Sequence, residues 1–60
     1  MKVIELLDLT TCEVIAIRQS GKSLFIGAVE NAPYKYIRRD VIAFGLGDVD
    51  DHLAGLIISI

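Results

Sequence analysis

The chain has 60 residues and a formal net charge of −2, with 53% hydrophobic and 23% charged residues. This length allows one small domain, and high hydrophobicity at low net charge excludes a disordered chain. The single cysteine excludes an internal disulfide, and no set of cysteine and histidine has zinc-site spacing. Small domains without disulfides or structural metal sites commonly bury apolar surface against another chain. The composition therefore favours a protein that associates.

The sequence also indicates a location. The longest apolar run, residues 53–58, is far shorter than the ~20 residues of a transmembrane helix. Glu5 and Asp8 lie where a signal peptide would be apolar. We therefore expect a cytoplasmic protein with no membrane segment. The sequence pI of about 5.0 argues against a general nucleic-acid binder.

The first half of the chain predicts one helix and two strands. Apolar residues recur at helical spacing from Val3, which predicts a short helix over residues 3–9. Residues 13–18 and 23–29 are rich in β-branched or aromatic side chains, which is typical of strands. The segment 19–22 between them is short enough for an antiparallel hairpin.

The second half predicts another helix and two more strands. Asn31 can cap a helix and Pro33 suits its first turn, which predicts two turns over residues 33–39. Strands are predicted over residues 40–46 and 53–60, and an acidic loop joins them.

The predicted order α-β-β-α-β-β defines an α+β fold. We expect one domain over residues 1–60, built on a small antiparallel four-stranded sheet, flat or curled. The two short helices would lie over one face or an edge of that sheet.

Apolar residues occur on both faces of the predicted strands. Leu24 and Phe25 are neighbours in the second strand and therefore point to opposite faces. In the third strand, Ile42, Phe44 and Leu46 share one face, and the other face is also apolar. Two short helices can hardly cover both faces of the sheet. We therefore expect a homo-oligomer, either a dimer or a larger assembly.

The run 20–23, Ser-Gly-Lys-Ser, ends like a phosphate-binding loop. Such a loop also needs a glycine where this chain has Ala16, and a helix after the lysine, where a strand is predicted. We favour a plain hairpin turn.

The acidic run near the C-terminus could hold a cation. Its candidate ligands are Asp48, Asp50, Asp51 and His52. A calcium loop of the EF-hand type needs glycine and glutamate where this chain has Leu53 and Ser59. We favour a solvated loop without a metal or cofactor, and the alternative is a magnesium or adventitious divalent site.

Cys12 and His52 are the only cysteine and histidine, so they form the one nucleophile–base pair of that kind that the chain could build. No predicted helix N-terminus or basic neighbour would activate the thiol of Cys12. We expect no catalytic residues and no cofactor, and hence a protein that is not an enzyme.

Cationic and aromatic side chains cluster in the predicted second helix. Lys35, Arg38 and Arg39 have the spacing of one helical face, with Tyr34 and Tyr36 beside them. This combination suits a protein interface or nucleic-acid stacking, and it is also common on a solvated helix. Together with the acidic run, the candidate partner-binding residues are Tyr34, Lys35, Tyr36, Arg38, Arg39, Asp48, Asp50 and Asp51.

A characteristic order of apolar and turn residues extends over nearly the whole chain. Its segments are residues 4–9, 13–17, 24–27, 32–37, 40–42 and 56–60. In this pattern the chain resembles small accessory proteins encoded in bacteriophage and prophage genomes of Gram-positive bacteria. The resemblance implies a protein without an assigned activity, and some small phage proteins of this kind bind and inhibit host defence nucleases.

The leading hypothesis is a non-enzymatic, phage-encoded binding protein that self-associates through its sheet. It would act stoichiometrically on a host protein by occlusion, for example on a component of a defence system. One alternative is a structural protein that assembles into a symmetric oligomer. Another is a weak nucleic-acid binder that uses Lys35, Arg38 and Arg39.

Overall fold

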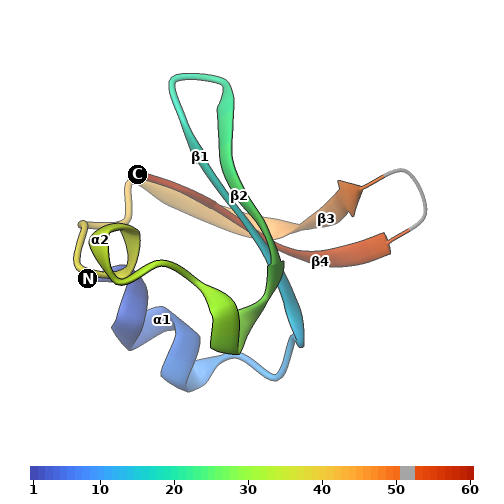
Figure 1. Cartoon of the computed structure of the whole chain (residues 1–60), viewed down its shortest axis with the longest axis horizontal. Helices are drawn as coiled ribbons and strands as arrows, with labels where there is room; N and C mark the ends of the chain where they lie inside the picture. Colours follow the sequence, from blue (N-terminus) through green and yellow to red (C-terminus); the bar gives the residue numbers. More distant parts are fainter. Residues whose placement is uncertain (51–52) are drawn as a thin grey trace.

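The computed structural model describes residues 1–50 and 53–60, and Figure 1 shows their helices and strands. In chain order the elements are α1 (Val3–Leu9), β1 (Val14–Gln19), β2 (Lys22–Ala28), the 3₁₀ turn η1 (Val29–Asn31), α2 (Tyr34–Ile37), β3 (Ala43–Asp50) and β4 (Leu53–Ser59). The α-helices and strands follow the predicted order, so the α+β class is confirmed. The bounds of α1 are as predicted, and those of β1, β2 and β4 differ from the predictions by one residue.

The four strands form one mixed sheet in the order β2-β1-β4-β3. The hairpins β1–β2 and β3–β4 are antiparallel, but the central pair of β1 and β4 is parallel. The prediction of an antiparallel sheet is therefore wrong for the central pair. The segment 29–42 carries the chain from β2 through α2 to β3, and a crossover of about a dozen residues or more permits parallel neighbours.

The two hairpins point in different directions, as Figure 1 shows, so the sheet is strongly twisted. β1 and β2 are joined by Ser20 and Gly21, whose φ angles are 52° and 81°. Two consecutive positive φ values are typical of a type I′ hairpin turn. Lys22 then opens a strand and not a helix, which confirms the hairpin and excludes a phosphate-binding loop.

The core lies between α1 and one face of the sheet. It consists of Val3, Leu6, Ile15, Ile17, Leu56, Ile58 and Ile60. In the parallel pair, Ile15 lies opposite Leu56 and Ile17 opposite Ile58, so these four side chains share that face. Full burial of a side chain of this size contributes about 1.5–3 kcal/mol. The parallel pair therefore positions the residues on which α1 docks.

On the other face of the sheet, small residues of β1 and β4 lie beside Ile57. Ala16 is fully buried there, between the two isoleucines that point to the core. A Cβ at Gly55 would collide with the carbonyl oxygen of Val14, and Cγ1 of Val49 would lie 3.1 Å from it. Glycine at position 55 thus allows β1 and β4 to pair closely.

The second helix is shorter than predicted. α2 is a single turn, Tyr34–Ile37, and the prediction was residues 33–39. Pro33 is the N-cap residue of α2, and Asn31 ends η1 rather than capping α2. Within residues 1–50 and 53–60, no helix combines the length and the apolarity needed to cross a membrane.

The chain leaves α2 early because the N-terminal end of α1 holds the residues that follow it. The N–H of Val3 donates a hydrogen bond to the carbonyl of Arg39 (2.9 Å). The N–H of Val41 donates one to the carbonyl of Met1 (2.8 Å). These bonds tie the turn to α1, so the backbone cannot continue as a helix.

The third strand begins and ends later than predicted, at Ala43–Asp50 instead of residues 40–46. Part of the predicted acidic loop therefore belongs to β3. Asp48 pairs with Ala54, and the register shifts between Asp48 and Asp50. The cross-strand pairing with β4 overrides the turn preference of the glycines and aspartates in this stretch.

Candidate interaction surface

The predicted basic group lies on α2 and directly after it. Lys35 is in the helix, but Arg38 and Arg39 follow its last residue, so the predicted face of one helix does not form. The Lys35 ammonium lies 5.0 Å from the centre of the Tyr36 ring, and the Arg38 guanidinium lies 5.4 Å from that of Tyr34. Such contacts at exposed sites are worth about 0.5–1 kcal/mol each. Each of these two cations is thus held against one tyrosine ring of the same turn.

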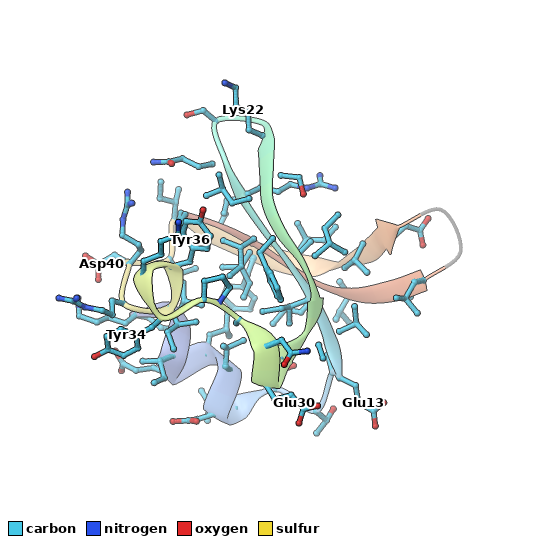
Figure 2. The ribbon with its side chains drawn as sticks, viewed as in Figure 1. Glu13, Lys22, Glu30, Tyr34, Tyr36 and Asp40 are labelled. Carbon is cyan, nitrogen blue, oxygen red and sulfur yellow. The ribbon has the colours of Figure 1, made fainter. Side chains whose placement is uncertain are left out.

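We call residues 34–39 the basic turn. Tyr34 is 68% exposed, whereas Tyr36 packs against the core. The neighbouring Asp40 forms an exposed ion pair with Lys2 at 3.5 Å, an interaction worth at most about 1 kcal/mol. Figure 2 shows Tyr34 and Asp40 on the same side of the molecule. The basic turn thus presents an aromatic ring and cations to solvent at one end of the fold.

The predicted acidic group lies at the other end of the sheet. Asp48 is exposed near the end of β3, and Asp50 is the last residue of that strand. Asp51 and His52 lie outside the described residues. In Figure 1, α2 and the end of β3 lie at opposite sides of the molecule. Among the residues that the structure describes, the predicted basic and acidic groups therefore do not meet within one chain.

Several large exposed apolar side chains lie on β3 and near it. Ile42 is 78% exposed, Leu46 is 80% exposed, and Phe44 between them is more than half exposed. We call these three residues the β3 strip. Leu9 at the end of α1 is 73% exposed, and Met1 is also exposed. A gathering of this kind on one strand and its neighbouring helix is typical of an interaction site.

A groove of about 390 Å³ runs between α1 and β3. Its lining residues are Met1, Leu6, Leu9, Thr10, Phe44, Gly45, Leu46 and Leu56. Leu56 and Leu46 are opposite each other in the β3–β4 register, so the core continues sideways into the groove. We call this feature the α1–β3 groove. Because most of its lining side chains are apolar, it offers burial to a partner rather than acid–base groups.

The opposite face and the outer edge of β3 are open as well. A hollow of about 250 Å³ on β3 and β4 is lined by Ala43, Phe44, Gly45, Leu46, Ile57 and Ser59. β3 is the last strand of the sheet, so its outer edge pairs with no described strand. The residues 43–50 contain no proline, lysine or arginine, which commonly block pairing at such an edge.

A larger hollow of about 580 Å³ lies near the start of β1 and is lined by Glu13, Val14, Ala28, Val29 and Glu30. Figure 2 shows Glu13 and Glu30 on the same side of the molecule. Both glutamates are exposed, so water screens their charges. We assign no ligand to this hollow.

The β3 strip could be recognised in the sequence only in part. The alternation of Ile42, Phe44 and Leu46 places them on one strand face, but partner contacts were predicted on α2 and in the acidic run. That face is the core face, where the register pairs Phe44 with Ile58. Only the three-dimensional structure shows that α1 covers the centre of this face and leaves its β3 side open.

The predicted pair of Cys12 and His52 stays untested, because His52 lies outside the described residues. Cys12 carries a half-buried free thiol. Its backbone N–H donates a hydrogen bond to Oγ1 of Thr10 (3.1 Å). Among the described residues, no three histidine, cysteine or acidic side chains gather as a metal site. The alternative divalent site in the acidic run depends on Asp51 and His52, so the structure does not test it.

No family model, curated protein or solved structure matches this chain. The resemblance to small phage proteins therefore stays a prediction.

Proposed function

We propose that this protein is a non-enzymatic binding protein that self-associates through its sheet and acts stoichiometrically on another protein. The observation that carries the proposal is the β3 strip beside the α1–β3 groove. Exposed apolar side chains scattered singly over a surface are ordinary, but a contiguous group on an open edge strand is typical of an interface.

The energetics support an interface that uses the strip and the groove together. Full burial of Phe44 or Leu46 is worth about 1.5–3 kcal/mol each, and association costs at least about 4 kcal/mol in translational and rotational freedom. One side chain alone therefore cannot hold two chains together. In a symmetric pair each contact occurs twice, so a few such side chains suffice.

The partner in the wider proposal is a host protein, and the mechanism is occlusion of its surface. The resemblance to phage accessory proteins supports this choice, and so does the exposed pairing of Tyr34 with Arg38, because tyrosine and arginine are enriched at energetically important interface positions. We place the protein in the cytoplasm, a proposal with which the free thiol of Cys12 agrees.

Symmetric assembly without a host target is the second candidate, and the same open strand β3 favours it. The two candidates differ in the size of the assembly and in the presence of a second protein. A ring or particle of many copies would favour the structural role, whereas a small oligomer with a second protein bound would favour the binding role.

The experiment compares two lysine substitutions at exposed apolar positions on the two edge strands. Leu46→Lys on β3 places a charge in the proposed interface, and we expect it to weaken self-association at least about 100-fold, since the burial of two leucines is lost. Ile26→Lys on β2, whose side chain is also exposed, is the matched control. The measurement is sedimentation equilibrium, with circular dichroism to confirm that both variants are folded.

Equal association of the two variants would contradict the proposed role of β3. For the action on a host protein, the measurement is the molar ratio of the captured protein to this chain in a purified complex. A fixed ratio of small integers is expected. Turnover of a substrate by sub-stoichiometric amounts of the chain would contradict a binding role.

A further inference from the structure

The outer edge of β3 pairs with no described strand. We infer that two copies of this chain pair antiparallel along the outer edges of their β3 strands, around a two-fold axis near Gly45 and Leu46. This inference rests on the proposed function and adds the occupant of the surface and its arrangement. The two four-stranded sheets then form one continuous sheet, with both α1 helices on the same side.

The backbone of β3 is suited to this pairing. An edge strand presents unpaired N–H and C=O groups that another strand can use, and natural proteins block this with charges, proline or bulges. In β3 the register shift and the charges lie only at the end, at Asp48 and Asp50. The stretch 43–47 is uncharged, and a Cβ at Gly45 would meet no atom within 4 Å.

The other edge of the sheet is less suited. β2 begins with Lys22, and the β1–β2 ladder is irregular between Ile17 and Arg18. Leu24 and Phe25 are partly buried against the core, so their surface is already used. The edge of β3 is therefore open and apolar, whereas the edge of β2 carries a lysine and is partly buried. A second copy pairs more readily with β3.

The charges at the two ends of β3 select the antiparallel direction. Arg38 and Arg39 lie in the basic turn shortly before the strand, and Asp48 lies near its end. Asp40, which follows the arginines, is paired with Lys2, so the segment before the strand stays basic. Antiparallel pairing brings the acidic end of each strand toward the basic turn of the other copy, twice in each dimer. Parallel pairing would place like charges together, which is destabilising. An uncharged apolar peptide would leave this complementarity unused, so a second copy is the better occupant.

The apolar contacts agree with the same arrangement. Side chains of paired strands stay on their own face of the sheet, so the β3 strips of the two copies lie side by side. A standard interface of about 800 Å² per partner would be about a fifth of the 4072 Å² surface of this chain. One strand edge is too small for this area, so the α1–β3 groove, with Met1 and Leu9 at its rim, belongs to the interface.

The first test is disulfide trapping with three single-cysteine variants, Phe44→Cys, Gly45→Cys and Leu46→Cys, made in a Cys12→Ser background. Only the residue nearest a two-fold axis faces its own copy, so we expect one strong maximum of cross-linked dimer. Ile26→Cys on β2 is the control, and we expect no dimer from it. Equal cross-linking at all three positions would indicate parallel pairing and overturn the inference.

The second test reverses the charges. We expect Asp48→Lys to weaken dimerisation about tenfold at low salt, since two exposed ion pairs are lost and two repulsions are added. Adding Arg38→Glu and Arg39→Glu to the same chain should restore most of the lost affinity, as in a double-mutant cycle. An unchanged affinity for Asp48→Lys, or no recovery in the combined variant, would overturn the charge pairing.

The outcomes separate this inference from the proposed function. If Leu46→Lys dissociates the oligomer but no cysteine variant shows a maximum, β3 is an interface and the antiparallel arrangement is wrong. If the unmodified chain stays monomeric at all concentrations, both the arrangement and the proposed self-association are wrong.

Discussion

At the residue scale, two glycines in paired strands have opposite roles. Gly55 in β4 faces the carbonyl oxygen of Val14, and there is no room for a side chain. Gly45 in β3 faces open space. Alanine at position 55 therefore tests the close approach of two backbones. Alanine at position 45 tests only the conformational freedom of the chain.

We expect Gly55→Ala to destabilise the fold by at least about 2 kcal/mol, because the clash is with backbone and must move a strand. In a domain of this size, whose core supplies only about 3–5 kcal/mol, a loss of about 2 kcal/mol removes roughly half of the stability. Urea unfolding followed by circular dichroism measures the effect.

Gly45→Ala is the matched control at low protein concentration. It should raise the free energy of unfolding by about 0.5 kcal/mol, since alanine restricts the unfolded chain and meets no atom in the folded one. Equal effects of the two substitutions would contradict the close approach of β1 and β4.

At the element scale, α1 supports both the core and the interaction surface. Its inner residues Val3 and Leu6 are buried in the core, and Leu9 lines the α1–β3 groove. A helix of seven residues is too short to be stable alone, so its first turn and its docking must hold it. The carboxylate of Glu5 contributes by accepting a hydrogen bond from the Lys2 N–H at 3.0 Å.

We expect Glu5→Ala to lower the free energy of unfolding by about 0.5–1 kcal/mol, because it removes this hydrogen bond and a negative charge at the N-terminus of the helix. Glu5→Gln keeps an oxygen acceptor and should lose less than half as much. Thermal unfolding of the unmodified chain and the two variants at equal concentration measures the order of their stabilities. A larger loss for glutamine than for alanine would contradict the capping role.

The elements show how far the sequence alone could lead. The spacing of Val3 and Leu6 was sufficient to predict α1 correctly, because a helical spacing pattern is contained within the helix itself. β3 was misplaced because Gly47 and Asp48 favour a turn locally, and only pairing with β4 makes them a strand. The parallel direction of β1 and β4 depends on a crossover, which local patterns do not specify.

At the scale of the whole molecule, the main feature of this chain is the apolar surface that its small fold leaves exposed to solvent. The sequence was sufficient to predict apolar residues on both strand faces. It could not show which of them α1 covers, so the candidate contacts were assigned to Tyr34 and its neighbours rather than to the β3 strip. The structure places the basic turn and the acidic end of β3 apart, which gives each copy two complementary ends.

A coupled equilibrium follows from this arrangement. Since association stabilises only the folded state, the thermal midpoint should rise with protein concentration. Leu46→Lys should remove this dependence and leave the midpoint of the isolated chain nearly unchanged, because Leu46 is largely exposed. Differential scanning calorimetry over a concentration series measures both effects. A midpoint of the unmodified chain that is independent of concentration would contradict the coupling.

The most direct test of the central claim, self-association through β3, is the mass of the unmodified chain in solution. Sedimentation equilibrium between about 1 and 100 μM covers the dissociation constants expected for a small apolar interface. We expect the weight-average mass to rise from 6.6 kDa toward twice that value as concentration increases. A mass that stays at 6.6 kDa over the whole range would contradict the account.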